Sequence, residues 1–211
     1  MADQPSTRSI KIADDERGGW SSDRPRRGGP DRPADISTRC RVLAPSEALR
    51  YSPASLLLIV SPSSERREAF AERLIQDRGS LLSLERVRRL LAGRVPEEEM
   101  DAKAQELLDA AARKRFEAGE PVVVTATGLD PAERERYARL AAAAKRPRHV
   151  ILIEAGADGV QDEDRRALND LRRRLDAGEL GAEGFQTAMR LGGEAVSELK
   201  RIVFAHEPRD E

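Results

Sequence analysis

The segment Leu56–Ile75, LLLIVSPSSERREAFAERLI, places a polar turn between a continuous apolar run and a helix-like stretch. Strand–turn–helix corners of this kind bind phosphate when the turn reads G-x-x-x-x-G-K-[ST]. In that pattern glycines let backbone N–H groups point inward, the lysine neutralises phosphate oxygens, and the hydroxyl binds magnesium. Here Ser61 and Arg66 stand at the two glycines, Arg67 at the lysine and Glu68 at the hydroxyl. The context is that of a phosphate site, but the residues are altered.

Each altered residue weakens the chemistry that this turn could perform. Arg66 and Ser64 do not easily adopt the positive φ that glycine allows, and the guanidinium of Arg67 is a wide fork rather than a point charge. Glu65 and Glu68 would bring carboxylates near phosphate oxygens. A like-charge pair about 4 Å apart costs on the order of 4 kcal/mol at an effective dielectric of about 20, although a magnesium ion could bridge part of this. An ordinary corner whose acids favour the helix N-terminus explains the same residues. The candidate phosphate-binding set is Ser61, Ser63, Ser64, Arg66, Arg67 and Glu68.

Composition excludes several classes of function. The chain has 211 residues and a formal net charge of −1, so its overall charge favours neither nucleic acid nor membrane. Aromatic residues make up only 3%, which leaves little for base stacking. The single cysteine, Cys40, cannot cross-link the fold or build a zinc cage. No apolar run reaches the length of a membrane span and the N-terminus has no signal-like apolar core, so we expect a cytoplasmic protein without a membrane partner.

Apolar runs that alternate with helical patterns define the elements that would position the turn. Strands are expected at 55–61, 80–84, 121–127, 149–155 and 200–204. Helices are expected at about 65–77, just after 84, at 96–118, at 130–145, in the arginine-rich stretch from 162, and as a short segment in 181–193. This order predicts an α/β fold of three layers with a central parallel sheet of about five strands. Ligands of such sheets bind at the carboxyl ends of the strands.

Composition also divides the chain near residue 40. Residues 1–40 are rich in Gly, Pro, Ser, Arg and Asp, with too few apolar residues to offset the entropy of ordering. We expect them to form a disordered N-terminal tail, in which Trp20 is either a short docking motif or an ordinary tail residue. Residues 41–208 form the predicted folded domain.

Segments that follow the turn carry a resemblance to a known family. They are LLSLERVRRLLAG at 81–93, ELLDAAARKRFEAGEPVVVTATGLDPAERERYARLA at 106–141, and AEGFQTAMRL at 182–191. In their order and spacing, from about Ser46 to Phe204, the chain resembles the P-loop kinase module of bacterial polynucleotide-kinase-like proteins. These are also described as AAA-family ATPases or zeta-toxin-like kinases. The resemblance implies a P-loop NTPase fold with a degenerate phosphate loop.

The resemblance assigns roles to residues outside the turn. An S-x-D-x-x-R segment in the family supplies a general base toward the acceptor hydroxyl and an arginine that holds an acceptor-side phosphate. Glu85 and Arg88 stand at these two positions. In the family's V-V-V-D-A-T-N-L segment the aspartate assists magnesium or the phosphates, and here Thr125 replaces it while Gly128 replaces the asparagine.

Further matches lie on the nucleotide side. Thr127 and Arg134 match family positions, and the family's arginine lid would fall in 162–174, with Arg165 and Arg166 as candidates. A solvated helix face explains the lid arginines equally well. Phosphoryl transfer relies almost entirely on positioning and charge stabilisation. Loss of several of these parts at once therefore predicts a loss of catalysis by many orders of magnitude.

Three functions remain open from the sequence. The leading hypothesis is a non-catalytic, degenerate kinase that binds ATP with Mg²⁺ weakly or not at all, and binds a nucleic-acid end, a phosphorylated ligand or a protein partner. The alternative is an active ATP-dependent kinase for a 5′-hydroxyl nucleic acid or a small alcohol. In it Arg67 would replace the lysine, Glu68 or another acid would bind magnesium, and Glu85 would be the base. The third is a structural interaction protein whose tail carries the function. No metal ligand set is assigned.

Overall fold

The computed structural model describes residues 39–154, 160 and 162–205. Nearly all of the predicted tail, including Trp20, lies outside the described residues, so its disorder and the boundary of the domain stay predictions. None of the helices in the described part of the chain is both long and apolar enough to span a membrane.

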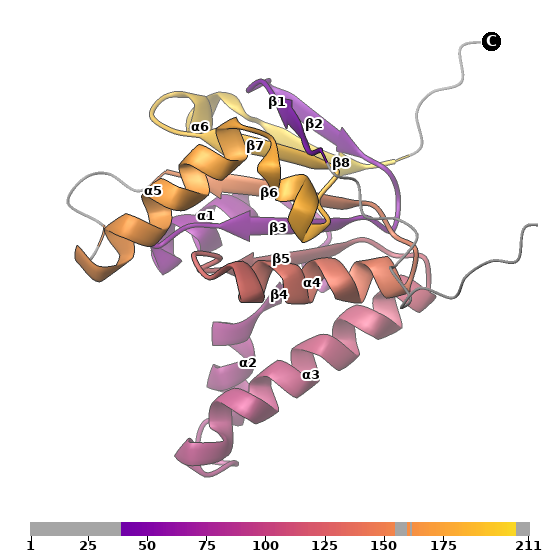
Figure 1. The fold of residues 1–211 in the computed structure, drawn as a ribbon. Coiled ribbons are helices and arrows are strands. Elements are labelled where there is room, and N and C mark those ends of the chain that lie inside the picture. Colours follow the sequence, from indigo (N-terminus) through magenta and orange to yellow (C-terminus); the bar gives the residue numbers. More distant parts are fainter. Residues whose placement is uncertain (1–38, 155–159, 161, 206–211) are drawn as a thin grey trace, which may run out of the picture. The chain divides into compact units, whose positions relative to one another are not determined.

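Six parallel strands form the central sheet, in the order β1-β7-β6-β3-β5-β4 (Figure 1). Their bounds are Arg41–Leu43 for β1, Leu56–Val60 for β3, Leu81–Ser83 for β4, Val122–Ala126 for β5, Arg148–Ile153 for β6 and Thr187–Leu191 for β7. Strands β3, β5 and β6 are buried along their whole length, which accounts for their continuous apolar runs. The predicted three-layer α/β fold is confirmed, with one strand more than the expected five.

A second, smaller sheet pairs β2 (Ala48–Tyr51) with β8 (Arg201–Phe204) in parallel register. The strand predicted at 200–204 is thus present, but it joins β2 instead of the central sheet. β2 itself lies in a stretch for which no strand was expected.

Helices cover both faces of the central sheet. On one face lie α3 (Glu97–Glu117), α4 (Pro131–Ala143), α5 (Asp162–Asp176) and the 3-10 helix η3 (Glu179–Glu183), which bury Phe116, Tyr137 and Leu171 among others. The other face carries α1 (Ser64–Leu74), α6 (Ala195–Glu198) and the small sheet. The two apolar clusters alternate along β3, so that Leu56 and Leu58 face one layer while Leu57 and Ile59 face the other.

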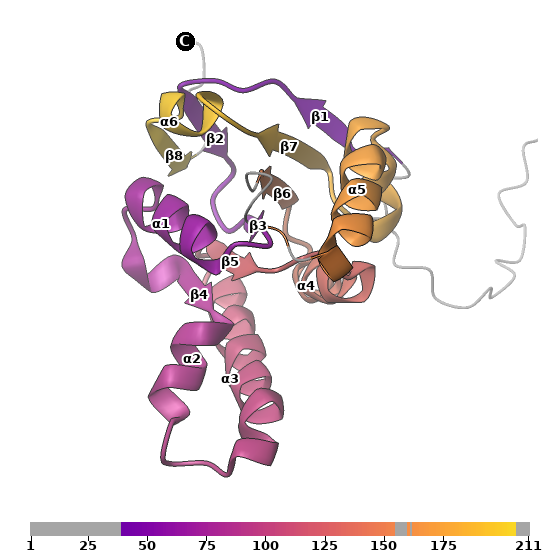
Figure 2. The same cartoon turned by 90° about the vertical axis from the view of Figure 1, so that its left-hand side faces the viewer.

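A hairpin of α2 (Leu84–Leu91) and α3 extends away from the sheet, as both views show (Figure 2). The 3-10 helix η1 (Arg78–Ser80) and β4 lead into it. No residue of α2 is fully buried, although the helix packs against α3. The side chains of α2 are therefore at least partly exposed.

The short helix predicted in 181–193 is wrong. The helix η3 ends at Glu183, Gly184 follows with a φ of 100°, and the chain then forms the strand β7. β7 lies between β1 and β6 in the sheet. Its residues TAMRL include good helix formers, so pairing with two neighbouring strands overrides local propensity here.

Candidate functional site

The turn after β3 is only three residues long, because α1 begins at Ser64. The Ser63 side chain caps this helix by accepting a hydrogen bond from the Arg66 N–H at 3.3 Å, and the Ser61 hydroxyl accepts one from the Ser63 N–H, also at 3.3 Å. None of the residues from Ser61 to Glu68 has a positive φ. The backbone therefore forms a capped helix start rather than a loop of inward-pointing amides.

Arg67, at the lysine position, points back into this turn and hydrogen-bonds its backbone. Its side chain is almost completely buried, and it donates from Nη1 to the Ser61 carbonyl oxygen at 3.0 Å and from Nη2 to Glu85 Oε1 at 2.6 Å. Its Nε is buried and has no hydrogen-bond partner in the described part of the protein. The guanidinium thus occupies the mouth of the turn and joins it to α2.

Glu68, at the position of the magnesium-binding hydroxyl, is engaged as well. Its Oε1 accepts hydrogen bonds from Ser83 Oγ at 2.9 Å and from Thr125 Oγ1 at 2.5 Å. One carboxylate thereby joins α1 to the ends of β4 and β5. Sequence reasoning missed Ser83, although its place just before the LER start of α2 marks it as an N-cap, and its hydroxyl does accept from the Arg86 N–H.

Glu85 and Arg88 lie on the same short helix but face different neighbours. Glu85 lies in the first turn of α2 and points to Arg67, whereas Arg88 donates to Asp101 on α3 at 2.8 Å. Both partners of the Arg88 pair are well exposed, so the pair contributes little to stability. The structure does not bring Glu85 and Arg88 together.

Arg134 lies away from the turn and is fully buried on α4. Its Nε and Nη2 donate to the two carboxylate oxygens of Glu183 at 2.7 and 2.6 Å, and its Nη1 donates to the Gly128 and Leu129 carbonyl oxygens. Arg174 approaches the same carboxylate at 2.6 Å. These contacts hold α4 and α5 to η3. Glu183 was not predicted from the sequence, because its partner is 49 residues away.

The lid arginines divide into two groups. Arg165 and Arg166 are exposed on α5, and Arg165 pairs with Asp162 one turn earlier on the same helix. Arg172, in contrast, binds Glu154 at the end of β6, and Arg190 of β7 binds the same carboxylate at 2.6 Å. Burial raises the pKa of Glu154, but the hydrogen bonds and charges of both arginines outweigh it and hold the pKa below its usual value. Helix α5 is thus fixed to the sheet by Arg172.

The remaining candidates lie near the turn without binding one another. Arg66 is exposed and donates to the Glu154 carbonyl oxygen at 3.2 Å. Thr127, just after β5, is half-buried. Gly128 has a φ of +62°, and a Cβ there would lie 2.5 Å from a methyl group of Val60, so only glycine fits where the resemblance places an asparagine.

The family model of the AAA domain matches residues 68–177, more than half of the chain. The chain therefore belongs to the AAA domain family, as the order of its segments predicted, and is a P-loop kinase-like module with an α/β fold. The matched range begins at Glu68, so the altered positions Ser61, Arg66 and Arg67 lie outside it.

Solved structures add two similar proteins. A candidate kinase from Chloroflexus aurantiacus is 15% identical, with a TM-score of 0.46 over 65% of this chain and 84% of that one. The tunicamycin resistance protein of Deinococcus radiodurans is 20% identical, with a TM-score of 0.40 over 68% of this chain and 91% of that one. Among curated proteins, the comparison found no match.

Proposed function

We propose that this protein is a non-catalytic member of its family, a binding module that has closed its nucleotide site and kept the opposite, acceptor-side face. The enclosed guanidinium of Arg67 carries this proposal. The group that should meet the nucleotide phosphates is instead bonded to Ser61 and Glu85.

ATP with Mg²⁺ does not fit the residues that surround the turn. A triphosphate would have to displace Arg67 from two hydrogen bonds and leave the Glu85 carboxylate without its partner. It would also meet the Glu68 carboxylate, whose Oε1 is already bound by two hydroxyl groups. Helix α1 begins at Ser64, after a turn of only three residues from β3, so there is no glycine-rich loop whose backbone N–H groups could bind the phosphates and compensate for these lost contacts.

The acceptor-side face supports the binding part of the proposal. Between α2 and α3 lies a pocket of about 430 Å³, lined by Arg88, Arg89, the acidic Glu97 and apolar residues that include Val95 and Met100. Arg89 has no ion-pair or hydrogen-bond partner among the described residues, and Arg88 has only its exposed pair with Asp101. Two guanidinium groups on one open helix suit a phosphate, so the proposed ligand is a phosphorylated one, such as the 5′-phosphate end of a nucleic acid.

Calorimetry with ATP, in the presence and absence of Mg²⁺, tests the first half of the proposal. We expect no binding up to millimolar ATP. Micromolar binding that Mg²⁺ strengthens and Arg67→Ala weakens would contradict it, and would favour the active kinase with Arg67 in the role of the lysine.

Fluorescence anisotropy tests the second half. A 5′-phosphorylated oligonucleotide should bind more tightly than the same oligonucleotide with a 5′-hydroxyl end, and the difference should vanish in the double variant Arg88→Ala, Arg89→Ala. Arg201→Ala, an exposed arginine on β8, is the matched control and should keep the difference. Equal affinity for both ends in the unmodified protein would refute phosphate recognition at α2.

A further inference from the structure

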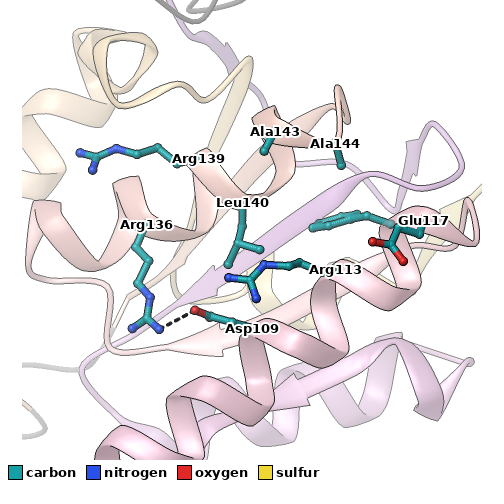
Figure 3. A pocket seen from close by; sticks show the side chains of 9 residues that line it. Asp109, Arg113, Glu117, Arg136, Arg139, Leu140, Ala143 and Ala144 are labelled. Atoms are coloured by element: carbon teal, nitrogen blue, oxygen red, sulfur yellow. Dashed lines mark hydrogen bonds and ion pairs between the residues drawn. The ribbon is translucent and has the colours of Figure 1, made fainter.

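A second pocket lies between α3 and α4, on the helix layer that covers one face of the sheet (Figure 3). Its volume is about 560 Å³, within the range of about 300–1,000 Å³ that is usual for small-molecule sites. Phe116, which is almost fully buried, and Leu140, Ala143 and Ala144 supply its apolar surface. A pocket of this size and lining is suited to a ligand with an apolar body.

One cation and one anion at this pocket, Arg113 and Glu117, take part in no ion pair among the described residues. Arg136 pairs with Asp109 at 2.7 Å, and Arg139 pairs with Glu135 on its own helix. Arg113 has no hydrogen-bond or ion-pair partner in the described ranges. In Figure 3 its guanidinium lies in the gap between the two helices, facing Leu140, while Arg139 turns away. An oxyanion at Arg113 would therefore gain a partner without displacing an internal one.

The two ends of the pocket differ, which gives a ligand a preferred direction. The helices run side by side, with Asp109 facing Arg136 at one end and Glu117 with Ala144 at the other. The second end lies at the C-termini of α3 and α4, where helix dipoles and the Glu117 carboxylate oppose an anion. The anionic group belongs at Arg113 and the apolar body beyond it, against Phe116 and Ala144.

This pocket is independent of the closed nucleotide site. Helix α3 leads into the start of β5 and α4 into the start of β6, so the C-terminal halves of these helices lie at the amino ends of the strands. The turn at Ser61, in contrast, follows the carboxyl end of β3. A ligand here would touch neither Arg67 nor the arginines of α2.

We propose that the pocket between α3 and α4 is a second binding site, specific for a small amphipathic anion. The ligand has an apolar body of ring or short-chain size and one carboxylate, sulfonate or phosphate group. Arg113 binds the oxyanion, and Phe116, Leu140 and Ala144 bind the apolar body.

A pair of fluorescent probes of nearly equal shape tests the charge and the pocket together. Anilinonaphthalene sulfonate carries an aromatic body and one sulfonate, whereas N-phenylnaphthylamine has the same rings without the charge. The sulfonate should bind the full-length protein saturably at one site, at least about tenfold more tightly than the neutral probe. Arg113→Ala should weaken it by about tenfold, Arg113→Lys should retain part of the affinity, and Ala143→Phe, an exposed position on the pocket rim, should abolish binding by filling the pocket.

Arg201→Ala is the matched control and should leave the affinity for the sulfonate unchanged. The thermal unfolding midpoint of every variant shows whether it is folded. Three results would overturn the proposal: no saturable binding of the sulfonate, equal affinity for both probes, or full affinity in a folded Arg113→Ala variant. Because Arg67 and α2 play no part, these results are independent of those with ATP and oligonucleotides.

Discussion

The guanidinium of Arg67 lies 2.6 Å from the carboxylate of Glu85 and joins the start of α1 to the start of α2. Resemblance to the family assigns these two positions to different partners, a nucleotide phosphate and an acceptor hydroxyl. Here the two groups neutralise each other. The pair has become part of the structure of the domain, and its removal should change stability.

Arg67→Ala should lower the free energy of unfolding by about 2 kcal/mol, because it leaves the buried Ser61 carbonyl oxygen without its donor and Glu85 without its counter-ion. Arg66→Ala is the matched control. The exposed Arg66 makes one hydrogen bond to a carbonyl oxygen, so its loss should matter by no more than about 0.5 kcal/mol. Urea unfolding measures the free energy of unfolding of both variants. Equal losses would show that the ion pair of Arg67 with Glu85 does not stabilise the fold.

The hydrogen bond between Glu68 and Thr125 should give a measurable coupling energy. In a double-mutant cycle of Glu68→Ala and Thr125→Val, the coupling should be about 1 kcal/mol, because Thr125 Oγ1 donates to a half-buried carboxylate. Thr127→Val serves as the control. The hydroxyl partners of Glu68 in the described part of the chain are Ser83 and Thr125, so the effect of Thr127→Val should add to that of Glu68→Ala within about 0.5 kcal/mol. Full additivity in the Thr125 cycle would refute the contact.

Of the substitutions that remove a charged side chain, Glu183→Ala should lower the free energy of unfolding most. It leaves Arg134 buried without its carboxylate and also removes a partner of Arg174, so we expect a loss of about 3–5 kcal/mol in the free energy of unfolding. Asp170→Ala, which breaks an exposed pair with Arg173 on α5, should change it by less than about 1 kcal/mol. Chemical unfolding of both variants checks the contrast, and a loss below 1 kcal/mol for Glu183→Ala would contradict it.

Stability should fall between pH 6.5 and pH 4 because of His149. Burial, and then the charge of Arg148, lower the pKa of His149 from 6.5 to about 4. In this window the unfolded chain binds a proton that the folded protein does not, so the contribution of neutral His149 is complete above pH 6.5 and is lost as the pH falls. Its ring stacks on Tyr51 at 4.4 Å and Nδ1 lies 2.8 Å from Thr187 Oγ1, which leaves no room for a hydrated cation.

Unfolding free energies measured across this range should therefore decline less steeply in His149→Gln than in the unmodified protein. Glutamine can keep a hydrogen bond to Thr187 but has no titrating ring. Parallel profiles for the two proteins would place the acid sensitivity elsewhere.

Much of the architecture could be predicted because buried parallel strands have a strong local signal. The runs at 55–61, 121–127 and 149–155 are apolar without alternation, as strands buried on both faces must be. The strands β2 and β7 escaped prediction because ALRY and TAMRL contain good helix formers. Only their pairing with distant strands makes them extended.

The candidate site was predicted in part, and the division has a physical origin. Position in the turn identified Arg67 and Glu68, and the family segments identified Glu85 and Thr125. Their bonding partners could not be predicted, because Glu68 meets Thr125 across 57 residues of chain and no local pattern reports such a contact. Whether an altered residue opens or closes a site depends on these long-range partners.

The small sheet has a consequence for the order in which the domain is built. Among the described strands, β2 pairs with β8 alone, in register from Ala48 with Arg201 to Tyr51 with Phe204, and β1 pairs only with the late strand β7. A ribosome must therefore add more than 150 residues before Tyr51 can meet its neighbour. β1 therefore lacks its partner until β7 is made, and β2 lacks its partner until β8 is made, so both early strands expose unpaired edges late into synthesis.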